Sequence, residues 1–264
     1  MRHDAPVLTD ILASLRSCSW VDLTHAFEPG IPHYVEFPDE TRRVLFHFDE
    51  GVGEIGSGFL AHEYRHIGQW GTHVDPPSHF VRDGRTLDEV SVDEMILPLV
   101  VVDVREACAS DADFACTRAT VEAWEAEHGP VPAGAFVALH TGWDARWPDG
   151  EAMQNRGPDG LSHYPGWGVD ALEMLVEQRQ ITAIGHDMTD TDPGARVSAG
   201  DVPAETYILG AARWQIEMLA NLGAVPATGA LIVATWPKPQ GGSGFPARAF
   251  AIVPPDRTDI GSAV

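Results

Sequence analysis

One short segment of the chain carries two imidazoles, a carboxylate and an amide at regular spacing. It reads Gln69-Trp70-Gly71-Thr72-His73-Val74-Asp75-Pro76-Pro77-Ser78-His79. In a strand, side chains two residues apart share a face, so Gln69, His73 and Asp75 would point to one side, with Gly71 leaving space between them. The Pro-Pro pair cannot continue a paired strand, so the chain must turn there and bring His79 toward the same pocket. Imidazole nitrogen and carboxylate oxygen are ligands of first-row metals, and the segment therefore predicts a divalent-metal site.

This segment resembles the signature of the cyclase family of metal-dependent hydrolases, which includes bacterial kynurenine formamidase and isatin hydrolase. The matching positions are Gly71, Thr72, His73, Asp75, Pro77 and His79. The upstream ligand histidine of the family is replaced by Gln69. Because an amide oxygen is a harder and weaker donor than imidazole, this replacement shifts the expected ion from zinc toward manganese.

The resemblance covers the chain from about residue 20 to residue 253. Segments that look like family elements are residues 22–24, 29–32, 100–104, 139–143 and 184–193. Glu205 follows Val202-Pro203-Ala204, where the family has Leu-Pro-x-His, and Glu217 stands at the family's ligand glutamate twelve residues later. The resemblance therefore implies a metal site made of Gln69, His73, Asp75, Glu205 and Glu217.

The two glutamates test this ligand set, because we expect one long helix over about residues 206–222. Twelve positions rotate roughly 120° around a helix, so both carboxylates reach one ion only if Glu205 precedes the helix or lies in its first turn. Pro203 favours a helix start there. The alternative for Glu217 is an i,i+4 pair with Arg213 on a solvated face. The family alignment is what places Glu217 in the site.

Two histidines are candidates for proton transfer. His79 is the family's proton-transfer position and can take a proton from metal-activated water and return it to the leaving group. His186 follows an apolar strand and projects from a strand end, where sites of α/β folds often lie. The alternative for His186 is a buried imidazole bonded to a carbonyl oxygen.

The pattern of apolar runs indicates a mixed α/β fold. Strands are expected at residues 97–104, 135–139, 181–185, 230–235 and 249–253. Helices are expected after the capping box that begins at Ser91, from Thr117 to about Glu127, and over residues 169–179. The family resemblance implies a swivelling β/β/α fold, which we expect as a single domain over residues 1–264.

Substrate identity is weakly encoded. Tyr34, Trp70 and Trp143 are candidates for an aromatic pocket that holds a planar substrate, and Tyr34 lies near a substrate-contacting aromatic position of related formamidases. Arg65, His66 and Lys238 are candidates for binding a carboxylate, although such side chains are commonly exposed. Glycine-rich residues 51–58 and 237–246 are expected to be mobile loops over the site.

Charge and cysteine content narrow the class of protein. The chain has 264 residues, with 39 acidic and 17 basic side chains and a net charge of −22, which argues against nucleic acid and anionic membranes as partners. No apolar run approaches the length of a membrane span or a signal peptide. Three cysteines without CxxC spacing fit reduced thiols. We expect a cytoplasmic homo-oligomer, a dimer or tetramer, that acts on a small molecule.

These observations predict a metal-dependent hydrolase that cleaves a formamide or a cyclic amide of lactam type by metal-activated water. The rival enzyme is a lactone hydrolase, or a cyclase or dehydratase that uses the same ion as a Lewis acid. A further alternative is a family member that binds metal or a small molecule without turnover, because two ligand histidines are replaced.

Overall fold

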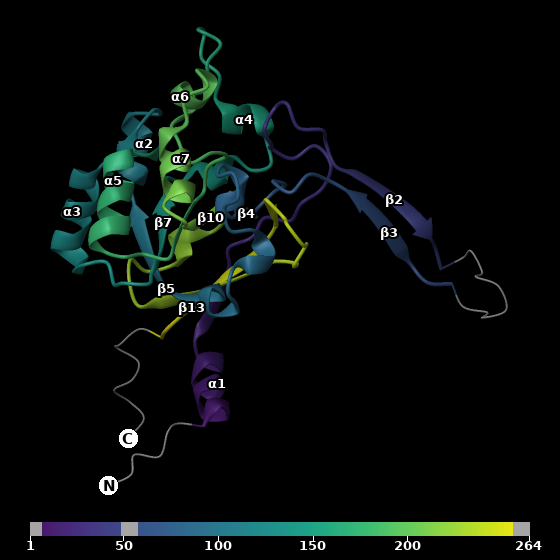
Figure 1. Cartoon of the computed structure of the whole chain (residues 1–264), viewed down its shortest axis with the longest axis horizontal. Coiled ribbons are helices and arrows are strands. Elements are labelled where there is room, and N and C mark those ends of the chain that lie inside the picture. The colour runs from purple at the N-terminus through teal and green to yellow at the C-terminus, as the bar shows by residue number, and fades with distance from the viewer. Residues whose placement is uncertain (1–6, 49–57, 256–264) are drawn as a thin grey trace.

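The computed structural model describes residues 7–48 and 58–255, and its centre is a nine-stranded sheet (Figure 1). The strands, in spatial order, are β1 (Ser19–Asp22), β13 (Arg248–Val253), β11 (Ala230–Thr235), β5 (Ile96–Asp103), β7 (Phe136–His140), β9 (Ala183–His186), β10 (Trp214–Glu217), β4 (His73–Asp75) and β12 (Phe245–Pro246). The four strands from β5 to β10 are parallel, and the flanking pairs are antiparallel. The predicted mixed α/β class is confirmed.

The central strands are continuous apolar runs because both faces of the sheet are covered. Along β5, Val100 and Val102 pack into the core beneath the helices, whereas Leu99 and Val101 pack into a second core on the opposite face. The helices are α1 (Leu8–Arg16), α2 (Arg105–Ser110), α3 (Arg118–His128), α4 (Gly150–Gln154), α5 (Val169–Glu173), α6 (Gly194–Ser198) and α7 (Pro203–Gly210). Figure 1 shows α2, α3, α5 and α7 gathered on one side of the sheet.

Most expected elements form at the expected places. All five predicted strands are present within one or two residues of their bounds, and Thr117 caps α3 by accepting a hydrogen bond from the backbone N–H of Thr120. Gly129 ends α3 with φ +87°, a value that favours glycine. Two helices differ from expectation: the capping box at Ser91 starts only a 3₁₀ turn, and α5 continues into a widened turn over Met174–Gln178.

The long helix predicted over residues 206–222 is wrong. Helix α7 ends at Gly210, and Ala212 adopts φ +59° as the chain reverses into β10. In β10, Trp214 and Ile216 fill the core while Gln215 and Glu217 face the other way. Burial of alternate side chains between β9 and β4 thus overrides local helix propensity. Glu217 is a buried strand residue, so the pair with Arg213 on a solvated face is also wrong.

A two-stranded ribbon, β2 (Thr41–Phe46) and β3 (Ala61–Arg65), extends away from the body of the molecule (Figure 1). Another short pair, β6 (Ala115–Cys116) and β8 (Gly166–Trp167), lies beside the helices. Almost all of the loop expected at residues 51–58 falls outside the described residues. Within the part that is described, no helix is both long and apolar enough to cross a bilayer.

Candidate metal centre

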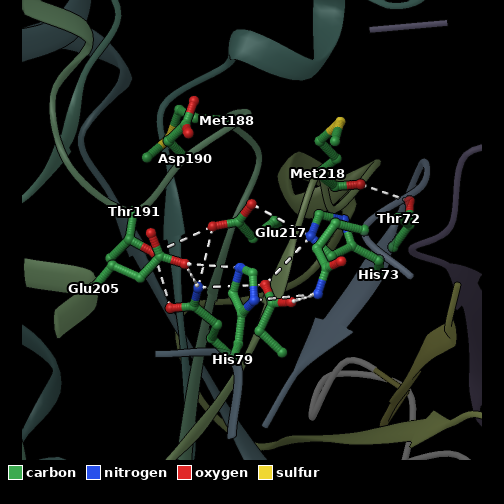
Figure 2. A network of polar contacts seen from close by, with 12 residues as sticks. Thr72, His73, His79, Met188, Asp190, Thr191, Glu205, Glu217 and Met218 are labelled. Carbon is green, nitrogen blue, oxygen red and sulfur yellow. Dashed lines mark hydrogen bonds and ion pairs between the residues drawn. The ribbon is translucent and has the colours of Figure 1, made fainter. Parts of the chain in front are cut away.

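The centre of the site is a pair of antiparallel strands, β4 and β10. In their register, Glu217 lies opposite His73, and Gln215 lies opposite Asp75. Side chains at i and i+2 of a strand share a face, so all four point into one space. Figure 2 shows His73, His79, Glu205 and Glu217 converging there. The prediction that His73 and Asp75 share a face is therefore confirmed, although the strand itself is only three residues long.

His73 is held as a nitrogen donor. Its Nδ1 lies 2.8 Å from the carbonyl oxygen of Gly71, so an Nδ1–H donates there and Nε2 is the ring nitrogen that would bind an ion. Nε2 is buried and, among the described residues, has no hydrogen-bond partner. It lies 3.2 Å from Oδ2 of Asp75 and 3.5 Å from Oε2 of Glu217. This arrangement of one nitrogen and two carboxylate oxygens fits a divalent cation.

The pKa values of His73 and Asp75 also indicate a site for a cation. Burial opposes a charged imidazole, but the carboxylates of Asp75 and Glu217 raise the pKa of His73 to about 9. Burial likewise opposes the charged form of Asp75, yet His73 holds the pKa of Asp75 at about 2. The pocket therefore binds positive charge, and a proton on His73 occupies the place that a metal ion would take.

A second donor group shares Asp75 with the first. It consists of Asp75, His79 and Glu205, whose donor atoms lie within 4.8 Å of one another. His79 follows the Pro-Pro turn in a short 3₁₀ segment, Pro77–His79, which brings its Nε2 to 3.9 Å from Oε1 of Glu205. The turn expected from the two prolines is thus present and delivers His79 to the site.

Glu205 and Glu217 reach this space from different elements. Glu205 is the third residue of α7, in the first turn that the sequence argument required, with Pro203 at the helix start. Asp192 fixes that turn by accepting hydrogen bonds from the backbone N–H groups of Ala204 (2.9 Å) and Glu205 (3.0 Å). Burial and the charges of neighbouring carboxylates raise the pKa of both glutamates. A bound cation would relieve this repulsion.

Gln69 enters the site as a hydrogen-bond donor and not as the predicted oxygen ligand. Its Nε2 donates to Oδ1 of Asp75 at 3.0 Å and to the carbonyl oxygen of Ser243 at 2.9 Å. Both neighbours are acceptors, so the amide nitrogen must face them. Gln69 therefore orients Asp75 instead of replacing the missing imidazole.

His186 lies behind Glu217 and not on the wall of the cavity. Its Nδ1 is 3.2 Å from the carbonyl oxygen of Met188, and its Nε2 is 3.5 Å from Oε1 of Glu217. Burial lowers the pKa of His186 to about 4, so the ring stays neutral. This is the alternative foreseen from the sequence, a buried imidazole bonded to a carbonyl, and it corrects the catalytic role proposed for His186.

The donors open into a cavity of about 290 Å³. Its apolar wall consists of Tyr34, Phe37, Phe80, Val197, Val202 and Met218. Tyr34, one of the three aromatic residues predicted to form the pocket, lines this cavity. Trp70 and Trp143 do not line it, because both are buried elsewhere. Nε1 of Trp70 donates to Glu40, and Nε1 of Trp143 donates to the carbonyl oxygen of Met153. The prediction that these two tryptophans form the pocket is corrected.

A family model described as "Putative cyclase" matches residues 21–193, which is more than half of the chain. The chain belongs to this cyclase family. The family prediction made from the motif is thereby confirmed, and the match includes the whole segment from Gln69 to His79 and the acidic run that contains Asp192.

Relatives within the cyclase family cover nearly all of the chain. Isatin hydrolase of Roseibium aggregatum is 35% identical over 247 residues, which is 89% of this chain and 91% of the relative. The structure of isatin hydrolase A from Labrenzia aggregata bound to benzyl benzoate has a TM-score of 0.83 at 30% identity and covers 94% of this chain and 99% of its own. An isatin hydrolase bound to the product analogue thioisatinate has a TM-score of 0.84 at 31% identity, covering 94% and 97%.

Sequence reasoning missed three residues that position the candidate ligands of this cyclase-family site. Gln215 and Thr191 are buried beside Glu217, and Asp192 fixes the start of α7. Gln215 stands two residues before Glu217, so a strand assignment for residues 214–217 would have placed both on one face. The helix assignment concealed that signal.

Proposed function

We propose that this chain is a metal-dependent hydrolase that opens a cyclic amide of lactam type in a small aromatic substrate. The observation that carries the proposal is the buried Nε2 of His73, which makes no hydrogen bond to the described residues and faces the carboxylates of Asp75 and Glu217. The substrate class is supported by the relatives named isatin hydrolases, since isatin is a cyclic amide. A divalent ion held by these residues would polarise the amide carbonyl and lower the pKa of a bound water.

We infer that His79 moves the proton. Its side chain is 23% exposed and lines the cavity, whereas His73 is almost completely buried. A neutral His79 accepts a proton from the attacking water and returns it to the departing amide nitrogen. Glu205, 3.9 Å from Nε2 of His79, stabilises the imidazolium between these two steps.

The apolar wall suits a planar ring. Tyr34, Phe37 and Phe80 line the cavity, and Tyr34 and Phe37 pack edge to face with ring centroids 5.2 Å apart. Aromatic rings attract a flat aromatic ligand through stacked or edge-on contacts. A volume of about 290 Å³ matches a substrate of one or two fused rings.

We propose manganese as the better supported ion. Each candidate group holds one imidazole and two carboxylates, which is an oxygen-rich donor set. Carboxylate oxygens suit manganese, whereas zinc sites commonly contain more nitrogen or sulfur. Gln69 does not contribute to this preference, because its amide nitrogen, and not its oxygen, is turned toward Asp75.

We also propose that the chain is a homo-oligomer in which a second copy covers the β2–β3 ribbon. The exposed apolar side chains of the ribbon and of the residues that continue it toward its outer end are Val44, Leu45, Phe46, Phe48, Phe59, Leu60 and Tyr64. The two strands carry three arginines against one glutamate, in a chain whose net charge is −22, so the ribbon complements the acidic body of another copy. Light scattering after gel filtration tests this proposal: Phe46→Asp should lower the mass, whereas Val92→Asp, at an exposed valine elsewhere, should not.

The catalytic proposal is tested by a screen of metal and substrate together. Metal-stripped protein is supplied with Mn²⁺ or Zn²⁺ and assayed on isatin-like lactams, aryl formamides and lactones. We expect lactam opening, with Mn²⁺ at least as effective as Zn²⁺. Faster turnover of lactones would support the lactone-hydrolase alternative. Tight metal binding without turnover of any class would support a non-catalytic member.

A further inference from the structure

Gln215 is a buried amide placed between the acidic ligands. Its side chain is completely buried on β10, opposite Asp75. Its Nε2 donates to Oε1 of Glu205 and to Oε1 of Glu217, each at 3.1 Å, and lies 3.5 Å from Oδ2 of Asp75. One amide nitrogen thus faces all three carboxylates of the two donor groups that share Asp75.

The other end of this amide is fixed by Thr191. The Thr191 hydroxyl donates to Oε1 of Gln215 at 2.8 Å. The opposite rotamer would place the amide oxygen against the oxygens of Glu205 and Glu217, where acceptors would face acceptors. The amide therefore has one orientation, with both N–H groups available to the carboxylates.

With the amide in this orientation, the two carboxylate oxygens of Glu217 have different neighbours. Oε1 accepts from Gln215 and lies 3.2 Å from Oγ1 of Thr191. Oε2 is left facing Nε2 of His73 at 3.5 Å. With Oε1 bonded to the protein, only Oε2 points to the space between His73 and Asp75.

We propose that Gln215 is a positioning residue of the metal site, one that makes Glu217 a single-oxygen ligand through Oε2 and holds Glu205 alongside it. The inference rests on the proposed function only in requiring that the site bind a divalent ion. Without the amide, the buried carboxylates of Glu205 and Glu217 would face each other with no donor between them, and Glu217 would keep only the contact of its Oε1 with the Thr191 hydroxyl. Hydrogen bonds that orient ligands in this way typically contribute about 10–100-fold to metal affinity.

The test compares Mn²⁺ binding by the whole chain with and without this amide. Gln215→Met preserves the length of the side chain and removes both donors. The control is Gln154→Met, because Gln154 is partly buried and accepts a hydrogen bond from Ser162 but lies outside the site. Titration calorimetry without substrate should show affinity about 10–100-fold weaker in Gln215→Met, with unchanged stoichiometry, and no change in Gln154→Met.

Thermal melts in the presence of a chelator separate positioning from folding. If the affinity of Gln215→Met falls only in proportion to its folded fraction, Gln215 is merely structural and the proposal is overturned. Wild-type affinity in the variant overturns it as well. If Gln215→Met does not fold, Gln215→Asn takes its place, because the shorter amide remains polar but cannot bridge both glutamates. This variant should also bind Mn²⁺ more weakly than the wild type. Wild-type affinity in Gln215→Asn would refute the inference.

Crystals of the Mn²⁺ complexes supply a readout that a structural role would not alter. Wild-type protein should show Glu217 bound through Oε2 alone, and Gln215→Met should show it rotated or bound through both oxygens. Binding of both oxygens in the wild type would refute the inference while leaving metal-dependent hydrolysis intact. If the wild type binds neither Mn²⁺ nor Zn²⁺, the proposed function fails and this inference fails with it.

Discussion

His73 and Glu217 lie directly opposite each other on antiparallel strands β4 and β10, with Nε2 of His73 3.5 Å from Oε2 of Glu217. The candidate metal-binding face thus depends on the register of one short strand pair. A slip of one residue in β4 would turn His73 to the other face of the sheet, away from Glu217. The bond from the Thr72 hydroxyl to the carbonyl oxygen of Met218, 2.6 Å long, secures this register.

The first prediction concerns the nitrogen ligand. His73→Ala should abolish tight binding of Mn²⁺ and Zn²⁺. His73, Asp75 and Glu217 form one donor group, and the substitution removes the imidazole of that group. Asp75→Ala should have the same effect, since Asp75 belongs to both groups. Elemental analysis of purified protein measures the bound metal. His128→Ala, at a partly exposed histidine on α3, serves as the control, and full occupancy in His73→Ala would refute the site.

The second prediction concerns the position of Glu205. Asp192→Ala should remove the acceptors that bind the first N–H groups of α7, at a cost of about 0.5–2 kcal/mol in the free energy of unfolding, as for other helix caps. Because Glu205 would then shift, metal affinity should also fall. Urea unfolding and Mn²⁺ titration measure the two effects. Asp201→Ala, an exposed aspartate paired with Arg196, should change neither by a comparable amount.

The sequence motif predicted one half of the site well. His73, Asp75 and His79 lie within seven residues, so local periodicity and the proline turn were sufficient to bring them together. Glu217 was assigned by family resemblance but to the wrong element. Its true position depends on pairing between β10 and two strands distant in the sequence, β4 and β9, which no local pattern reports.

The errors about individual roles have a similar origin. Gln69 and Gln215 both carry an amide, and only their neighbours decide which end faces the site. Trp143 follows the end of β7, close to polar residues, yet its ring turns into the core and its Nε1 donates to the carbonyl oxygen of Met153. The direction in which a side chain points is set by its packing in the fold, and the spacing of residues along the chain does not reveal that packing.

The third prediction concerns the dependence of stability on pH at Asp187. Burial raises the pKa of this carboxyl to about 6, although it accepts hydrogen bonds from the backbone N–H groups of Thr141, Gly142 and Trp143. The folded state therefore holds the proton to higher pH than the unfolded state, whose pKa is about 3.8. The stabilisation is fully present below pH 4 and is lost as pH rises toward 6.

Comparison with Asp187→Asn isolates this group from the other acids. As pH rises from 4 to 6, the free energy of unfolding of the wild type should fall relative to that of the variant, by on the order of 1.4 kcal/mol for each unit by which the pKa is raised. Urea unfolding across this range measures the difference. Asp10→Asn, on exposed helix α1, is the control. A difference that does not vary with pH would contradict a raised pKa at Asp187.

The fourth prediction separates proton transfer from metal binding. His79 lines the cavity, beyond the Pro-Pro turn, and it belongs to the group of donors that lacks His73. If it transfers the proton of the attacking water, His79→Ala should retain the metal bound by His73, Asp75 and Glu217 but lose about 10²–10⁴-fold in turnover. Its kcat should fall while the affinity for a product analogue changes little. Elemental analysis and steady-state kinetics on the same preparation measure both quantities. Loss of the metal together with activity would make His79 a ligand, and unchanged turnover would place the base elsewhere, with Glu205 the next residue to replace because it lines the same cavity.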